Sequence, residues 1–173
     1  MKRFITALTV LALMGFAGSA MAQTANHDIT IDFTGFALMA LNNSSAITLT
    51  VDNTGVSAGE APAGDSNSDK WLNYTVLTPS ASPYEIVASL DSNMPGGLQL
   101  QAVSAAPTGT GGVGTEAVAF NLTDVDQTIV GSITSCWTGT GSNGANITYA
   151  LSVTGAVDAV DATRTVTYTI QAE

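Results

Sequence analysis

The sequence has very few of the residues that carry covalent or acid–base catalysis. Its 173 residues include one cysteine, Cys136, and one histidine, His27. A thiol nucleophile needs a neighbouring base, and the only histidine lies far from Cys136 in the sequence. Neither a Gly-x-Ser-x-Gly elbow nor a Gly-x-x-x-x-Gly-Lys phosphate loop is present. We therefore expect that the protein is not an enzyme.

A lone cysteine also excludes a disulfide bond within the chain. Stability must then come from backbone hydrogen bonds and an apolar core. Free cysteine is among the most buried residue types, so we expect Cys136 to be a buried, inert thiol. An intermolecular disulfide is the alternative.

Basic residues are scarce as well, with four Lys and Arg against fourteen Asp and Glu. Without residues 1–22, which include Lys2 and Arg3, the formal charge falls to −12 because only two cations remain. Binding of nucleic acid depends on cations that neutralise phosphates, so this acidic protein is not expected to bind DNA or RNA. The same charge favours cationic partners.

Long apolar runs are absent except at the N-terminus. Met1, Lys2 and Arg3 precede a 13-residue apolar stretch, and a small-residue segment ends in Ala-Met-Ala at Ala22. These features predict a signal peptide over residues 1–22. The stretch is shorter than the roughly 20 residues that span a bilayer. We expect a secreted chain with no transmembrane segment, exported to the periplasm, the cell surface or the medium.

Straight-chain helix formers are rare in residues 23–173, whereas Thr, Val and Ile recur at alternating positions, which is typical of strands. We expect one all-β domain, an antiparallel two-sheet β-sandwich (Ig-like or jelly-roll-like) of about eight to nine strands. A closed barrel is the alternative. The expected strands cover 27–34 and 36–41, which form one segment interrupted at Gly35, and then 46–51, 70–77, 84–90, 98–105, 116–122, 127–133, 145–154 and 163–170.

The last two of these ranges are expected to pair with each other. Val166, Tyr168 and Ile170 alternate with threonines, so one face of the strand should be buried and the other exposed. The Gly-rich stretches 109–114 and 139–144 are interpreted as flexible turns.

The N-terminal segment 27–41 carries a long alternating apolar face. Its odd positions are Ile29, Ile31, Phe33, Gly35, Ala37, Met39 and Leu41. Such a segment can be the first strand of its own sheet, with a bend at Gly35. It can also pair with a neighbouring molecule by strand addition, in which alternate side chains fill pockets. In the second case Ile29, Ile31, Phe33, Gly35, Ala37 and Met39 form the assembly strand.

One short polar stretch resembles the start of a calcium loop. Asp65, Asn67 and Asp69 place oxygen ligands at alternate positions, but Lys70 and Val76 occupy the places where such a loop has glycine and glutamate. A polar turn explains the stretch better. Calcium at Asp65, Asn67 and Asp69 is therefore a weak prediction, and no other cofactor is expected.

Aromatic residues make up only 6% of the chain, yet some could stack on sugar rings. Trp71, Tyr74, Tyr84 and Trp137 are the candidates. Trp71 and Tyr74 are three residues apart and therefore face opposite sides of a strand. A monomeric extracellular carbohydrate-binding module is the alternative function that these residues allow.

A family resemblance covers most of residues 23–173. It rests on Trp71 to Thr75, Met94-Pro95-Gly96-Gly97-Leu98, the Gly/Thr loop 138–144, and the strands 147–154 and 165–170. This succession resembles small secreted bacterial β-sandwich proteins without an assigned activity and, more loosely, pilin-like subunits of the spore-coat-U and fimbrial type. The chain departs from the latter in lacking their cysteine pair and in having a shorter segment after Gln23. The resemblance implies surface fibres built by donor-strand pairing. We therefore expect a cell-surface protein in cell adhesion or fibre structure, with itself or another surface subunit as partner. A glycan is a possible ligand under the carbohydrate-binding alternative.

Overall fold

The computed structural model describes residues 25–79, 82–157 and 161–173, so the expected signal peptide lies outside the described residues. Clustering of contacts divides the chain into two units, residues 1–32 and 33–173. The described residues of the first unit, 25–32, form neither helix nor strand. The eleven strands found among the described residues all lie in the second unit, whose described residues contain no helix.

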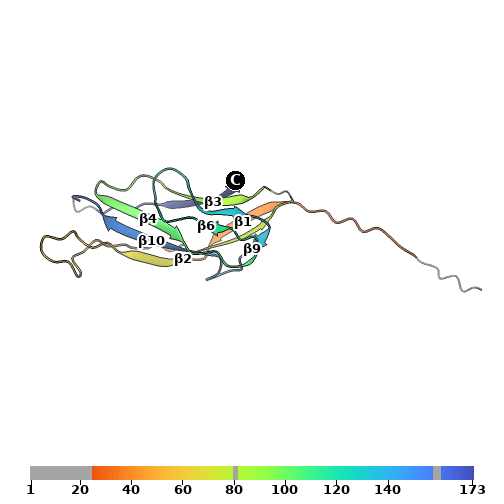
Figure 1. Cartoon of the computed structure of the whole chain (residues 1–173), viewed down its shortest axis with the longest axis horizontal. Helices are drawn as coiled ribbons and strands as arrows, with labels where there is room; N and C mark the ends of the chain where they lie inside the picture. The colour runs from red at the N-terminus through yellow and green to blue at the C-terminus, as the bar shows by residue number, and fades with distance from the viewer. Residues whose placement is uncertain (1–24, 80–81, 158–160) are drawn as a thin grey trace, which may run out of the picture. The chain divides into compact units, whose positions relative to one another are not determined.

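The strands form two antiparallel sheets arranged like a sandwich, which confirms the all-β prediction (Figure 1). The larger sheet has the order β5 (Thr110–Gly111), β9 (Cys136–Trp137), β2 (Ser66–Leu77), β10 (Ala145–Val153), β4 (Leu98–Ser104) and β7 (Phe120–Asn121). The first strand, β1 (Phe36–Leu41), pairs with β2. The smaller sheet has the order β11 (Val166–Ala172), β3 (Tyr84–Leu90), β8 (Gln127–Ile133) and β6 (Thr115–Glu116).

The eleven strands exceed the eight to nine that the sequence predicts. β5 lies in a stretch expected to be a turn, and β9 lies between an expected strand and an expected turn, so the sequence predicts neither of these short strands. The expected strand 116–122 is divided. Its two ends are β6 and β7, which belong to different sheets. Residues 117–119 therefore carry the chain from one sheet to the other.

Two expected strands are not found. Residues 27–34 have no strand pairing, and residues 46–51 have none either, although Ile47 and Leu49 pack against the core. The nearest pairing to 46–51 is one isolated bridge between Asp52 and Ala63. Apolar alternation thus marks the side chains of 46–51 that reach the core, but a strand also needs a backbone partner.

The expected pairing of the last two strands is wrong. β10 pairs with β2 and β4, whereas β11 pairs with β3 in the other sheet. Their matching alternation has a different physical origin: both strands direct one face into the same core from opposite sides.

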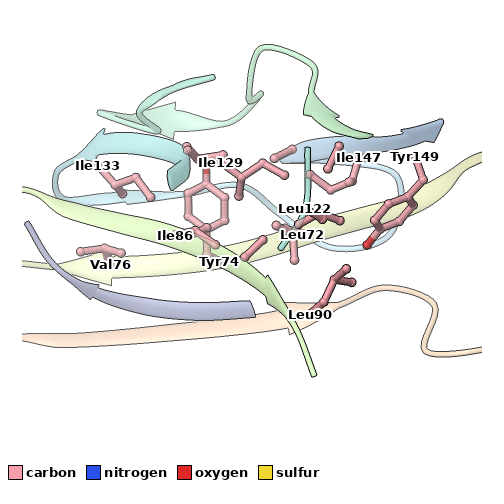
Figure 2. Close-up of a cluster of buried hydrophobic side chains, with 14 of the residues drawn as sticks. Leu72, Tyr74, Val76, Ile86, Leu90, Leu122, Ile129, Ile133, Ile147 and Tyr149 are labelled. Carbon is pink, nitrogen blue, oxygen red and sulfur yellow. The ribbon is translucent and has the colours of Figure 1, made fainter. Parts of the chain in front are cut away.

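The core fills the space between the sheets (Figure 2). Its largest fully buried side chains are Leu72, Ile86, Ile129, Ile133, Ile147, Val76, Val130 and Cys136. Burying each large aliphatic side chain contributes about 1.5–3 kcal/mol. On β2 the even positions from Lys70 to Val76 point inward, because all four are buried. Lys70 is satisfied at the end of this row by donating from Nζ to the carbonyl oxygens of Asn43 and Ser45.

A bulge interrupts the pairing of β3 with β8. Tyr84 is opposite Ile133 and Ile86 is opposite Val130, so Gly131 and Ser132 both lie opposite one residue of β3. Ser132 has a φ of 57°, and no other described non-glycine residue has a positive φ. Its backbone N–H donates to Glu173 Oε1 at 3.2 Å. This contact holds the C-terminal residue against the bulge.

Candidate assembly surface

The N-terminal apolar face is divided by the structure at Gly35. On its C-terminal side, β1 pairs within the chain along its whole length, from Phe36 opposite Leu77 to Leu41 opposite Leu72. Ala37 and Met39 accordingly pack half-buried against the core of their own chain. These two members of the expected assembly strand already have partners.

On the N-terminal side of Gly35, three large apolar side chains are uncovered. Ile29 is 75% exposed, Ile31 is 70% exposed and Phe33 is 69% exposed. Exposed large apolar side chains in a row are unusual in a soluble domain unless they serve an interaction. We call residues 29–33 the donor segment.

Gly35 lies at this division for a steric reason. A Cβ atom there would lie 2.6 Å from Cδ of Pro79 and 3.1 Å from the carbonyl oxygen of Leu77. Only glycine lets the chain pass Pro79 this closely as it enters β1. Gly35 is thus the residue directly before the start of β1.

Strand β11 lies at the edge of the smaller sheet. Among the described strands it pairs with β3 alone, so one side of its backbone lacks a ladder partner. We call this side the β11 edge. The inner side chains of β11, Val166, Tyr168 and Ile170, are only half-buried although they pack against the core.

Hydrogen bonds at both ends of β11 show which backbone groups lie at the β11 edge. Asp91 N donates to Thr165 O, and Glu173 N donates to Pro83 O, both at 3.0 Å. Odd residues of β11 therefore direct their N–H and C=O groups toward β3, and even residues direct theirs away from it. Val166, Tyr168 and Ile170 thus combine edge backbone groups with inward side chains.

β1 and β11 contact one another, and they run next to each other in the two sheets (Figure 2). Both strands have half-buried inner faces, formed by Ala37, Met39 and Leu41 on β1. The sandwich is thus less completely covered along this side than at its centre, where Ile86 and Ile129 are fully buried.

A separate exposed patch lies on the outer face of the larger sheet. Trp137 is 58% exposed and is paired with Thr75 on one side and Thr110 on the other. Thr75 is in turn opposite Leu38, which is 63% exposed. Of the four aromatic residues considered for sugar stacking, Tyr74 is buried and Trp71 and Tyr84 are half-buried, so Trp137 presents the largest exposed fraction.

The loop beside Trp137, which the sequence predicts as a flexible turn, is hydrogen-bonded to β2. Asn73 Nδ2 donates to the carbonyl oxygens of Gly141 and Asn143 at 3.2 and 2.6 Å. Thr138 Oγ1 accepts from Tyr74 N at 3.0 Å. These bonds tie residues 138–143 to β2.

The residues of the weak calcium prediction lie at the beginning of β2. Asn67 Nδ2 donates to Asp69 Oδ2, and Asp69 N donates to Asn67 Oδ1, both at 3.0 Å. Asp65 Oδ1 accepts from Ser66 N at 2.7 Å. Nowhere in the described ranges do three or more His, Cys, Asp or Glu residues gather as a metal site. Calcium binding here stays a prediction.

Cys136 is buried, with 1% of its surface exposed, as predicted. Burial raises the pKa of its thiol, and a backbone hydrogen bond at Val76 partly offsets this. The thiol therefore stays protonated and poorly nucleophilic at neutral pH.

The β11 edge was not anticipated from the sequence, because alternation reveals faces but not which strand lies at an edge.

In the part of the chain that the structure describes, no helix is both long and apolar enough to cross a membrane. Comparison of the chain with protein-family models, with curated proteins and with solved structures found no match.

Proposed function

We propose that this chain is a non-enzymatic, exported surface subunit that self-associates by strand addition. The donor segment of one copy pairs with the β11 edge of the next. The observation that carries this proposal is the exposure of Ile29, Ile31 and Phe33 at alternate positions, outside the ladder of β1. The role is structural or adhesive, as in pilin-like fibres of the bacterial cell surface or periplasm.

The chemistry of the two surfaces is complementary. The donor segment has three exposed apolar side chains at alternate positions. They would pack against the three half-buried inner side chains of β11, beside the β11 edge. Burying each donor side chain contributes about 1.5–3 kcal/mol, and the backbone groups of Val166, Tyr168 and Ile170 gain ladder partners. Because donor and acceptor are different surfaces, the contact is head-to-tail and extends into a filament unless it closes into a ring.

The test is the size distribution of the chain from Gln23 to Glu173, measured by size-exclusion chromatography with light scattering. The unmodified chain should form a ladder of oligomers. Ile31→Asp and Phe33→Asp should both reduce the ladder to monomer, because each puts a charge where an apolar side chain is buried. Thr30→Asp is the matched control, since it adds the same charge to the opposite face of the segment and should leave the ladder intact.

A clean monomer of the unmodified chain, or a ladder that Ile31→Asp does not change, would contradict strand addition. A second experiment uses a peptide of residues 25–35 to locate the acceptor strand. Added to the Ile31→Asp chain, it should shift the amide signals of Val166, Tyr168 and Ile170 in NMR spectra. Shifts confined to another edge would reject the β11 edge as acceptor while retaining the donor.

A carbohydrate-binding module is the second candidate, favoured by the exposed Trp137 between two threonines. An indole ring on a flat sheet can stack on a sugar, and hydroxyl groups beside it can bind the sugar hydroxyls. This function predicts a monomer whose polysaccharide binding is lost in Trp137→Ala and kept in Trp71→Phe. Affinity electrophoresis in gels containing soluble polysaccharide distinguishes the two functions.

A further inference from the structure

The core is open at the end of the sandwich where β10 ends and β4 begins. Along the inner face of β10, Ile147 and Tyr149 are buried, whereas Leu151 and Val153 are only half-buried. Leu98, the first residue of β4, lies opposite Val153 and is half-buried too. The apolar face thus continues past the region that the other sheet covers. Figure 1 shows the loop between β1 and β2 at this end.

A cavity of about 1200 Å³ occupies this open end. Its wall includes the apolar residues Leu49, Val56, Met94, Leu98, Leu151 and Val153. Segments 48–53 and 56–60 of the loop between β1 and β2 form another part of the wall. An isolated bridge supports this loop, since Asp52 N donates to Ala63 O at 3.1 Å and Ala63 N to Asp52 O at 3.0 Å. The cavity is large enough for a small organic ligand, because pockets that bind such ligands usually have volumes of about 300–1,000 Å³.

The charged residues of the cavity wall are all acidic. Asp52, Glu60 and Asp161 line it, and none of the described residues of its wall is Lys or Arg. Asp52 Oδ1 accepts from Thr54 N, and Glu60 Oε2 accepts from Ser57 N. Each of these two carboxylates thus accepts a hydrogen bond from the backbone of its own loop through one oxygen.

Arg164 directly follows the cavity-lining residue Thr163 in the sequence, and its guanidinium group is already hydrogen-bonded to backbone carbonyl oxygens. Its Nε donates to Asn93 O at 2.9 Å, and one terminal nitrogen donates to Thr163 O at 2.8 Å. Among the described N-terminal residues, 25–33 contain Asp28 and Asp32 but neither Lys nor Arg, so they are no basic segment that could fill the cavity. Charge complementarity therefore favours a foreign cation over the donor segment of a second copy.

We propose that this cavity binds a small amphipathic cation, with its hydrocarbon part against the apolar wall and its charged nitrogen beside Glu60 and Asp161. The apolar wall supplies affinity in proportion to the hydrocarbon buried, and the carboxylates select the sign of the charge. This proposal does not depend on strand addition, because the donor segment contributes no residue to the cavity wall.

The test is isothermal titration of the chain from Gln23 to Glu173 with decyltrimethylammonium below its micelle concentration. Binding should be saturable with one site, weaken in 0.5 M NaCl, and fall steeply when the decyl chain is shortened to butyl. Decanoate, which has a similar hydrocarbon chain and the opposite charge, should bind at least tenfold more weakly.

The double variant Glu60→Gln/Asp161→Asn should bind the ammonium probe about fivefold more weakly. Glutamine at position 60 keeps an oxygen for Ser57 N, so the loop is retained. The matched control Glu116→Gln/Asp69→Asn removes two exposed carboxylates outside the cavity and should bind as the unmodified chain does. No binding, equal binding of decanoate, or an equal loss in both double variants would overturn the proposal. Binding measured in the Ile31→Asp monomer keeps the result separate from self-association.

Discussion

The phenol of Tyr149 on β10 is hydrogen-bonded to the phenol of Tyr168 on β11, so one contact joins the two sheets through the core. Burial raises the pKa of both phenols, and for Tyr168 the neighbouring Tyr149 raises it further. For Tyr149 the hydrogen bond partly offsets the effect of burial. The pair therefore stays neutral, and stays bonded, at pH values where exposed tyrosines ionise.

Removing one hydroxyl of this pair should destabilise the fold. Tyr168→Phe leaves the Tyr149 hydroxyl buried without its partner, which costs about 1–3 kcal/mol. Tyr149→Phe should have a similar effect, whereas the double variant should lose less than the sum of the two single losses, because no orphaned hydroxyl remains. Urea unfolding of the four proteins measures the coupling, and additive losses would contradict a bond between the two phenols.

Stability should fall at alkaline pH. Tyr74, Tyr149 and Tyr168 have pKa values raised by burial, so above about pH 10 the unfolded chain loses these protons while the folded chain keeps them. Below pH 10 both states are protonated and the three tyrosines give no pH dependence. Above it, each contributes a decline of about 1.4 kcal/mol per pH unit. Urea unfolding between pH 8 and 11 checks the slope, which should be smaller in Tyr168→Phe.

Cys136 should resist thiol reagents in the folded protein. Its side chain is buried, and burial raises its pKa, so the reactive thiolate is both rare and covered. Modification by a maleimide should be at least a hundredfold slower than in 6 M guanidinium chloride. Fast modification of the folded chain, or a dimer on non-reducing gels, would instead indicate an accessible thiol.

The bulge at Ser132 should discriminate sharply between substitutions. A β-branched residue at a φ of 57° is strained, so Ser132→Val should lower the free energy of unfolding by about 1–2 kcal/mol. Ser132→Gly relieves strain and should cost less than 0.5 kcal/mol despite the greater freedom of glycine when unfolded. Thermal unfolding of both variants provides the comparison. Equal losses would show that the serine side chain, rather than the backbone conformation, matters.

Much of the fold was predictable from local pattern. The expected ranges 84–90 and 127–133 agree with β3 and β8 residue for residue, and the range 36–41 agrees with β1. In these strands, period-two alternation and the boundaries set by Gly, Pro, Asn and Asp indicate the same limits. The burial of Cys136 and the opposite orientation of Trp71 and Tyr74 follow from equally local rules.

The remainder depends on which strands meet, and alternation alone does not contain that information. β10 and β11 alternate alike because each borders the same core, not because they pair. β5 and β9 have only two residues each, too few for any period to show, and they exist because Thr110 and Gly111 lie opposite Trp137 and Cys136. The exposure of the donor segment and the β11 edge likewise depend on sheet order, which brings together residues distant in sequence.

The connection between the sheets at residues 117–119 affects how the protein unfolds. Glu116 pairs with β8 in one sheet, and Phe120 pairs with β4 in the other. A connection of only three residues therefore links the two sheets. The two sheets cannot separate widely unless β6 or β7, the strands at the two ends of this connection, loses its pairing. Slow amide protons in the two sheets should therefore exchange through a single shared opening, and the sandwich should behave as one cooperative unit rather than as two separable layers.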